Sequence, residues 1–590
     1  MGGHAEDRRA QDSAQALTPR VARVVVDEPA LEKPFDYLVP ETMADHVRVG
    51  TIVRVPLHGR RVGGWIAALD VEPPEGVELR PIAKVTGWGP APELFGLARW
   101  AAWRWAGRPP HFLRTASPPG AVQGLPPAED VASVPVAPAD PLVHEALRRE
   151  RAVLRLPPSA DAYAMVAAAA ALGPTLVVAP AHATAQFLAS RLRRAGVPVA
   201  LLPREWPRAA AGTRVVVGAR AVAWAPVAGL AVVVVLDEHE EVHQEEASPT
   251  WHARDVAIER ARLAGVPCVL TSPCPSLEAL RWGDLLTLPR QDERAGWPVV
   301  DVVDRGREEP RRRNDLYSSK LVDLVRSGRR VICVLNRKGR VPLLACGACG
   351  ELARCERCGA AVALGDDGLT CRACTAERPA VCQACGSSQL KARRIGTTRA
   401  REDLERLAGV AVGEVTGESD AIPDATVLVG TEAVLRRVDT ADAVAFLDLD
   451  AELLAPRYRA AEQAMALVAR AARIVGGKSG GGRLLLQTRL PRHEVVLAAL
   501  HGDPSRVSAA EAERRESLGW PPFNALAHVS GAPATEYAES LRRQAGVTVL
   551  GPADGSYLVR APDHRTLCDA LAATPRPAGR LRVAVDPSRI

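Results

Sequence analysis

LAVVVVLDE, residues 230–238, is the stretch of sequence that most directly predicts the fold. Its seven apolar residues are followed at once by an acidic pair, Asp237 and Glu238. A strand that is apolar along its whole length has both faces covered, which is typical of a parallel sheet lying between helices. The stretch is far too short to span a bilayer, which takes about 20 apolar residues.

Similar apolar strands alternate with helical segments on both sides of this stretch. In the first series we expect a helix that ends at Arg194, a second helix around 252–264, and strands at 175–180, 214–219, 230–238 and 267–272. In the second series we expect a helix at 457–474 and strands at 330–336, 425–430, 443–450 and 483–488. Such alternation predicts α/β lobes with parallel sheets. We place one lobe at 141–295 and the other in two pieces, 296–341 and 391–495.

The regions outside the lobes differ in composition. Residues 21–90 contain short strands separated by Pro and Gly, which predicts a β-rich domain. Residues 91–116 have a helical pattern, and the Pro-rich residues 117–140 are typical of a linker. We expect residues 1–20 to be a disordered tail and residues 496–590 to form a small α+β domain.

Length, composition and charge limit the possible classes of protein. The chain has 590 residues, 47% of them hydrophobic, which is ordinary for a globular protein of about three to five domains. Its net charge of +6 is compatible with nucleic-acid binding but does not require it. The first twenty residues lack the apolar segment of a secretory signal, and no apolar run is long enough to cross a membrane. We therefore expect a cytoplasmic protein with no membrane partner.

Eight of the 12 cysteines form four Cys-x-x-Cys pairs within residues 342–390. Each pair supplies two thiolates, which is half of a tetrahedral zinc site, so four pairs predict two closed, structural zinc sites. Disulfides, an iron–sulfur cluster and a redox dithiol are weaker alternatives, because they fit neither a reducing compartment nor four regular pairs. The expected ligands are Cys346, Cys349, Cys355, Cys358, Cys371, Cys374, Cys382 and Cys385.

The acidic pair at the end of the first stretch raises the question of ATP hydrolysis. In P-loop ATPases such a pair holds Mg²⁺ and polarises the attacking water, but only beside a phosphate-binding loop. The segment where that loop is expected, VLRLPPSADAY at 153–163, has neither Gly nor Lys, and Pro157 and Pro158 remove two amide donors. The glycine-rich residues 476–480 precede an expected strand and lack the spacing of such a loop, so we interpret them as a turn.

Several longer motifs resemble the PriA family of primosomal replication-restart proteins, which are superfamily 2 DNA helicases. The similar stretches occur in the family's order along nearly the whole chain. They are EKPFDYLVPE (32–41), GTIVRVPL (50–57), WHARDVAIERARLAGVPCVLTSPCPSLEAL (251–280), VICVLNRKGRVPLLACGACG (331–350), LVGTEAVL (428–435), LDLDAELLAPRYRAAEQ (447–463) and LLLQTRLPRH (484–493).

This resemblance implies an architecture and a set of DNA contacts. The α/β lobes would be RecA-like helicase lobes with the zinc module inserted in the second, and residues 91–116 would be winged-helix-like. The β-rich domain would hold a DNA 3′ end. The implied DNA contacts are Phe35, Asp36, Gly59 and Arg80 in the 3′-end pocket, and Arg220 and Trp251 in the first lobe.

The resemblance also implies a nested pairing of the cysteines. The outer pairs would share one zinc ion and the inner pairs the other. The implied sets are Cys346, Cys349, Cys382 and Cys385 for the first ion, and Cys355, Cys358, Cys371 and Cys374 for the second.

The chain departs from the family at four motifs of the ATPase. Ser159 and Ala160 stand where the family has the Lys and Thr of its phosphate loop, and the acidic box is Asp237-Glu238-His239-Glu240 with its last two members exchanged. The family's Ser-Ala-Thr motif is Ser-Pro-Cys at 272–274, and the arginines at 470–474 are out of register with its arginine finger. An arginine finger alone is worth roughly 10³ to 10⁵ in rate. We therefore expect ATP-driven unwinding to be absent or very weak, with no catalytic residues and a vestigial Asp237 and Glu238.

These observations predict a replication-restart protein without helicase activity of its own. It would bind stalled or abandoned forks, single strands and 3′ ends, and promote loading of the replicative helicase. The implied cofactors are two Zn²⁺ ions, with little support for ATP and Mg²⁺, and the implied partners are primosome and helicase-loading proteins and single-stranded-DNA-binding protein. One alternative is an active ATP-dependent 3′→5′ DNA helicase with an altered phosphate site, and another is a zinc-dependent scaffold that binds only proteins.

Overall fold

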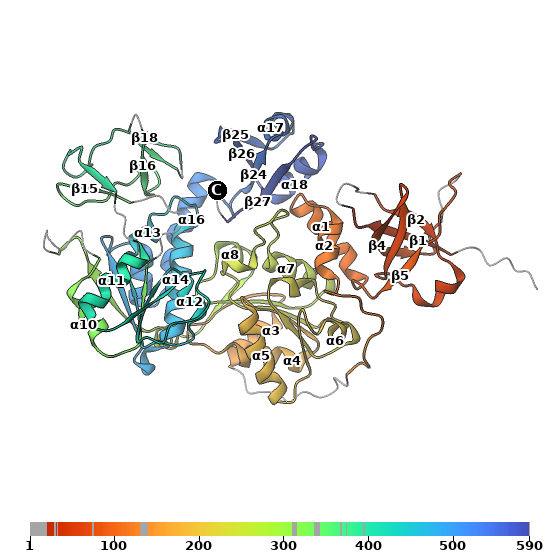
Figure 1. Ribbon diagram of the computed structural model, residues 1–590, viewed down its shortest axis with the longest axis horizontal. Coiled ribbons are helices and arrows are strands. Elements are labelled where there is room, and N and C mark those ends of the chain that lie inside the picture. The colour runs from red at the N-terminus through yellow and green to blue at the C-terminus, as the bar shows by residue number, and fades with distance from the viewer. Residues whose placement is uncertain are drawn as a thin grey trace, which may run out of the picture.

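The computed structural model describes residues 20–28, 31, 33–72, 76–129, 140–308, 316–335, 343–365, 368–372, 374–392 and 396–588. The predicted disordered tail lies outside these residues except for Arg20. In Figure 1 the β-rich N-terminal domain lies at one end, the first α/β lobe in the middle and the second at the other end. The zinc module and the C-terminal domain lie on one side of the two lobes. No helix in the described ranges is both long and apolar enough to cross a membrane.

The N-terminal domain is a small antiparallel sheet with the strand order β2-β1-β4-β3-β5. Its inner face is filled by alternating apolar residues such as Val24, Val53 and Val55. The two edges meet, because Leu38 at the end of β2 exchanges backbone hydrogen bonds with the segment before β5. Its elements are β1 (Val21–Val26), β2 (Phe35–Leu38), η1 (Glu41–His46), β3 (Ile52–Leu57), β4 (Arg60–Leu69) and β5 (Lys84–Gly87).

Two helices, α1 (Glu93–Arg104) and α2 (Pro109–Ala116), connect this domain to the first lobe. Trp105 and Phe112 are buried in the core that they share with that lobe. Residues 91–116, all of which are described, contain no strand. The winged-helix-like prediction is therefore confirmed only for its helices, since the wing has no counterpart there. The described part of the predicted linker, 117–129, has neither helix nor strand.

Lobe 1 contains a seven-stranded sheet with the order β12-β6-β11-β10-β7-β9-β8, parallel at each strand pair. Successive residues of β10, the strand quoted first above, are buried in cores on opposite faces of the sheet. The elements are α3 (Pro141–Arg148), β6 (Arg151–Arg155), α4 (Ala162–Leu172), β7 (Thr175–Val178), α5 (His182–Arg194), β8 (Val199–Leu201), α6 (Trp206–Ala211), β9 (Val215–Gly218), η2 (Arg220–Trp224), β10 (Val232–Val235), η3 (Glu241–His243), α7 (Ala253–Ala264), β11 (Cys268–Ser272), α8 (Leu277–Trp282), β12 (Asp284–Thr287) and α9 (Arg290–Ala295).

Lobe 2 contains a parallel six-stranded sheet with the order β13-β23-β22-β14-β21-β20. One of its two cores includes Val495 and Val496, so α15 belongs to this lobe and not to the C-terminal domain that was predicted to begin at 496. The elements are β13 (Val299–Asp304), α10 (Ser319–Arg326), β14 (Val331–Val334), α11 (Thr397–Ala408), β20 (Val412–Val415), β21 (Val427–Gly430), α12 (Val434–Arg437), β22 (Ala443–Phe446), α13 (Asp450–Leu453), α14 (Ala460–Val475), η4 (Lys478–Gly480), β23 (Arg483–Thr488) and α15 (Glu494–His501).

The zinc module is inserted between β14 and α11 and consists of two small antiparallel sheets. Its strands are β15 (Leu344–Cys346), β16 (Val362–Leu364), β17 (Leu369–Cys371), β18 (Glu377–Arg378) and β19 (Leu390–Ala392).

The C-terminal domain begins with α16 and has a four-stranded sheet with the order β25-β26-β24-β27. It docks on α1, because the Asp586 carboxylate accepts a 2.7 Å hydrogen bond from the buried Arg104. Its elements are α16 (Ser505–Leu518), β24 (Ala525–Gly531), α17 (Ala534–Leu541), β25 (Thr548–Ala553), β26 (Ser556–Ala561), α18 (His564–Ala573) and β27 (Leu581–Val585).

Candidate functional site

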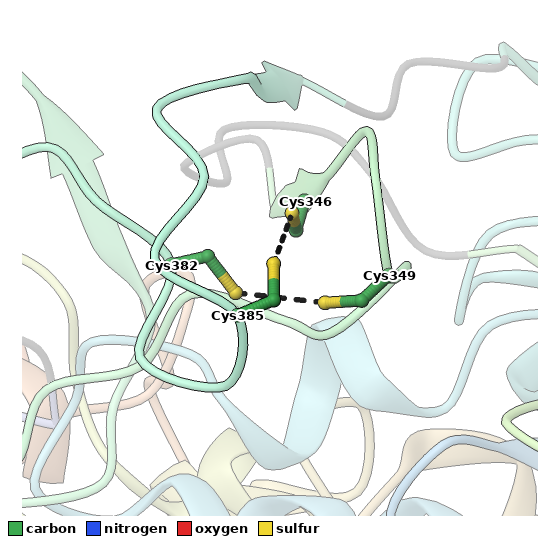
Figure 2. A group of neighbouring side chains, drawn as sticks. All are labelled: Cys346, Cys349, Cys382 and Cys385. Atoms are coloured by element: carbon green, nitrogen blue, oxygen red, sulfur yellow. Dashed lines mark hydrogen bonds between the residues drawn. The ribbon is translucent and has the colours of Figure 1, made fainter.

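The eight paired cysteines form two clusters of four, in the nested arrangement predicted above. Cys346, Cys349, Cys382 and Cys385 form one cluster, and the sulfur atoms of each cluster lie within 4.8 Å of one another. Figure 2 shows the four sulfur atoms of this cluster pointing toward a common centre. The other cluster consists of Cys355, Cys358, Cys371 and Cys374.

The distances between sulfur atoms fit tetrahedral zinc and not disulfide bonds. The sulfur atoms of Cys346 and Cys385 are 3.6 Å apart, and those of Cys358 and Cys371 are 3.5 Å apart. A disulfide would bring them to about 2.05 Å. Zinc–sulfur bonds of about 2.3 Å place tetrahedral ligands about 3.8 Å apart. Each cluster offers four sulfur ligands, so a bound zinc ion would have no open position for water and would act on structure.

The same backbone turn builds all four Cys-x-x-Cys pairs. In each turn the amide that follows the second cysteine donates to the carbonyl of the first, at 2.8 to 2.9 Å. Gly350, Gly359 and Gly386 take this position with φ angles of 73° to 78°, which glycine adopts without strain. The fourth turn has Thr375 there, at φ 59°.

The N-terminal domain has a cavity of about 430 Å³ at the end of the sheet. All four residues predicted for a 3′-end pocket, Phe35, Asp36, Gly59 and Arg80, line it. They come from β2, the β3–β4 turn and the segment before β5, so the fold brings together residues up to 45 positions apart. Gly59 has a φ of 79°, which allows the tight turn between β3 and β4. Sequence reasoning missed other lining residues, among them Tyr37, Pro56, His58, Val77 and Leu79.

The carboxylate of Asp36 is held in place by an arginine that sequence reasoning did not identify. Arg23 lies opposite Asp36 on β1, and its Nε and Nη2 donate to the two carboxylate oxygens at 2.8 and 3.0 Å. These hydrogen bonds and the charge of Asp36 raise the pKa of Arg23. The Asp36 side chain is only 8% exposed. Each of its oxygens still has a lone pair for a further donor, because an ionised carboxylate has about four acceptor positions.

Arg220 and Trp251, the two contacts expected in lobe 1, are engaged within the protein. Trp251 is only 5% exposed and packs edge-on against Trp224, with ring centroids 5.9 Å apart. Arg220 donates to the carbonyl of Gln244 at 2.7 Å and to the carboxylate of Glu245 at the same distance. In this arrangement neither side chain is free to bind DNA, so their role as DNA contacts stays a prediction.

The segment that corresponds to a phosphate-binding loop is closed by its own contacts. The amide of Ala160 donates to the carbonyl of Pro157 at 2.9 Å, and Asp161 caps α4 by accepting from the amide of Tyr163. A negative side chain thus occupies the helix terminus at which a phosphate would bind. A Cβ atom on Gly296 would lie 2.5 Å from the Pro157 ring, so the end of α9 packs directly on this segment.

The acidic box of lobe 1 is bound to arginines from α14 of lobe 2. Arg473 donates to both oxygens of Asp237, at 2.6 and 2.7 Å, and Arg470 donates to both oxygens of Glu240. Burial opposes the ionisation of Asp237, but the charge and hydrogen bonds of Arg473 outweigh it and lower the pKa of Asp237 to about 2. We call these four residues, Asp237, Glu240, Arg470 and Arg473, the interlobe clamp.

The sequence predicts that the arginine finger is lost, but the interlobe clamp shows that arginines of α14 still contact the acidic box. Arg470 and Arg473 are out of register with the family motif, yet both reach the face of lobe 1. Residues three apart lie on the same face of a helix, so α14 presents both guanidinium groups together. Their charges are taken up by the acidic box. The remaining carboxylate of the box, Glu238, is 1% exposed and accepts hydrogen bonds from Arg254 and Ser276.

Comparison with known proteins agrees with this geometry. The two parallel α/β sheets, and the acidic box of one lobe facing a helix of the other, agree with the arrangement that the family resemblance implied. Residues 23–118 match the family model of the PriA 3′ DNA-binding domain. The chain therefore contains a domain of this family, and its matched region includes α1 and α2.

Curated relatives extend the match over most of the chain. A probable replication restart protein PriA of Mycobacterium tuberculosis is 29% identical over 90% of this chain and 91% of its own length. The replication restart protein PriA of Treponema pallidum is 30% identical over 59% of this chain and 60% of its own. The predicted resemblance to the PriA replication restart proteins is thus confirmed over most of the chain.

Solved structures add only a general likeness. Dbp5 of S. cerevisiae, bound to RNA and ADP BeF3, has a TM-score of 0.34 and 11% identity, and covers 64% of this chain and 98% of its own. A likeness at this level has no bearing on activity.

Proposed function

We propose that this protein binds branched DNA at a strand with a free 3′ end and promotes loading of the replicative helicase, without hydrolysing ATP itself. One observation carries the proposal: the 3′-end pocket is open and lined by the expected residues, whereas the acidic box is occupied by arginines of the opposite lobe. The DNA-binding part of the molecule is thus available, and the part that would turn over ATP is not.

The chemistry of the pocket fits the last nucleotide of a DNA strand. Asp36 would accept a hydrogen bond from the terminal 3′-hydroxyl, because Arg23 fixes the position of its carboxylate. Arg80 would bind the adjoining phosphate, and the ring of Phe35 would pack on the sugar or base. A 3′-phosphate would bring its negative charge against Asp36 and be rejected.

The contacts of the ATP region support the absence of turnover. A magnesium ion held by Asp237 would have to displace Arg473, and a nucleotide phosphate would meet the capping carboxylate of Asp161. An ATPase of this type opens and closes its lobes in each cycle. The interlobe clamp joins the lobes in one arrangement, so we infer that the two lobes serve as a rigid frame for DNA and protein partners.

The zinc module offers a surface for such partners. Leu364 and Val381 are 58% and 40% exposed. A module this small needs its apolar side chains for its own core, so the exposure of these two favours contact with a partner. Primosome and helicase-loading proteins and single-stranded-DNA-binding protein are the partners that we propose for this chain.

A 3′-end binding assay tests the proposal. Fork DNA whose leading strand ends in a 3′-hydroxyl should bind at least tenfold more tightly than the same fork ending in a 3′-phosphate, at matched salt. Asp36→Asn should remove most of this preference, because a neutral amide no longer repels the phosphate. Asp45→Asn, an exposed residue of η1 outside the pocket, is the control and should keep the preference. Equal binding of the two forks by the wild-type protein would contradict the proposal.

The alternative is an ATP-dependent 3′→5′ DNA helicase with an altered phosphate site. The buried position of Glu238 favours it, because Arg254 and Ser276 hold this carboxylate as firmly as a functional residue would need. ATP hydrolysis that is stimulated by DNA and abolished by Glu238→Gln would support this alternative.

A further inference from the structure

Three cations on the outer face of the N-terminal sheet have no partner within the described part of the chain. Arg54 lies on β3, Arg61 on β4 and Lys84 on β5, and all three side chains are exposed. The alternation along β3 places Arg54 and Pro56 on the face opposite the buried Val55. Arg61 lies directly opposite Pro56, and Lys84 lies directly opposite Arg54. The three cations therefore form a row across one face of the sheet.

The row places like charges together without an acidic residue between them. Side chains directly opposite on neighbouring strands are about 5 Å apart, and like charges there are destabilising. Arg54 and Lys84 form such a pair. The nearest carboxylate across the sheet, Asp27, already accepts a 2.7 Å hydrogen bond from Arg114. Gly63 lies between Asp27 and Arg54 on this face of the sheet, and it has no side chain that could cover the backbone there. Arg20, Arg23 and Arg60 of the same domain are each paired with a carboxylate, whereas the row is not, so it calls for an external anion.

The row is continuous with the 3′-end pocket. Pro56 lines the pocket, Arg61 is its neighbour across the strands, and Arg54 lies two residues away on the same strand, which is about 7 Å. A polyanion whose end enters the pocket would therefore pass over Arg61, Arg54 and Lys84 in turn. A row of three charges on neighbouring strands fits the phosphates of a nucleic-acid strand better than a single small anion.

We propose that Arg54, Arg61 and Lys84 bind the phosphates of the nucleotides that precede the 3′ end. This inference rests on the proposed function of the pocket and extends its site from one nucleotide to a short single strand. The contacts are to phosphates only, so they add affinity and direction without reading sequence. The strand is thereby led away from the pocket over β3, β4 and β5.

Salt-dependent DNA binding tests this row. The affinity of Arg54→Gln and Lys84→Gln for a single-stranded 12-mer with a 3′-hydroxyl should fall several-fold, and the slope of log K against log salt should shrink by about 0.7 per variant. A dinucleotide with a 3′-hydroxyl, which ends inside the pocket, should bind both variants as it binds the wild type. That second result shows that the variants are folded and that the pocket is intact.

Arg60 provides a matched control. It lies next to Arg61 but on the other face of β4, and it is paired with Glu28 at 3.0 Å. Arg60→Gln should keep the wild-type salt slope. If the Arg54 and Lys84 variants also keep that slope while the wild type still prefers a 3′-hydroxyl, the row is refuted and the proposed function stands. If the wild type shows no preference for the 3′-hydroxyl, the proposed function is refuted, and the inference that rests on it is refuted with it.

Discussion

The contact between Asp237 and Arg473 links lobe 1 to lobe 2 through a single pair of residues. Asp237 follows the strand that would place it beside a magnesium ion, but its partner is an arginine 236 positions away in the chain. Burying one ionised carboxylate without a partner would cost several kcal/mol. Arg473 offsets that cost by donating to both oxygens. The residue that the motif alone would assign to metal binding thus joins two lobes.

Removing Arg473 should weaken the fold in a way that depends on pH. The pKa of Asp237 is about 2, well below its ordinary value of about 4, so the pair stabilises the folded state above pH 4. That contribution is lost as the pH falls through about 2. At pH 7 Arg473→Ala should lower the free energy of unfolding by about 1 to 2 kcal/mol, because Asp237 is buried but the Arg473 side chain is 43% exposed to solvent. The difference from the wild type should shrink between pH 4 and pH 2 in denaturant titrations.

Arg483→Ala is the matched control for this change. Arg483 pairs with Asp301 at 2.9 Å in the same lobe, but the Asp301 side chain is 33% exposed, against 10% for Asp237. Exposed pairs contribute only about 0 to 1 kcal/mol. Equal losses of stability for the two variants at pH 7 would show that the interlobe clamp stabilises the fold no more than an ordinary surface ion pair does.

At the scale of elements, strands and metal ligands were predictable because their signals are local. The strand expected at 483–488 matches β23 in full, since its short apolar run follows a glycine-rich turn and is typical of a buried strand. The cysteine spacing likewise identified all eight ligands, and the nested pairing followed from family resemblance. Arg23 was missed, and the pairing of Arg473 with Asp237 was not predicted, because both arginines meet their carboxylates through tertiary contacts that no local pattern encodes.

The two cysteine clusters should bind zinc independently. The wild-type protein should contain two zinc ions per chain by elemental analysis, and Cys371→Ser and Cys382→Ser should each lose one, because each removes a ligand from a different cluster. Cys274→Ser lies outside both clusters and should keep two. Loss of both ions in either cluster variant, or iron in place of zinc, would contradict the assignment.

Chelation should unfold the zinc module while leaving the lobes intact. The module has a core of only a few small apolar residues, so metal binding must supply much of its folding free energy. Hydrogen exchange after chelation should rise in residues 343–392 and stay low in β10 and β22.

At the scale of the whole molecule, the domains are joined by hydrogen bonds and ion pairs of charged side chains. The zinc module is tied to lobe 2 by a hydrogen bond from Arg489 to the carbonyl of Gly350, and the C-terminal domain is tied to α1 by Arg104 and Asp586. With the interlobe clamp, these contacts join the parts of Figure 1 into one frame. We expect this frame to present a bound 3′ end and its partner proteins in a constant geometry.

The most direct test of this account is ATP hydrolysis by the purified protein with and without forked DNA that carries a free 3′ end. The account predicts no hydrolysis above the blank in either case, while the same preparation binds the fork. The result that would contradict it is hydrolysis stimulated by the fork and lost in Glu238→Gln.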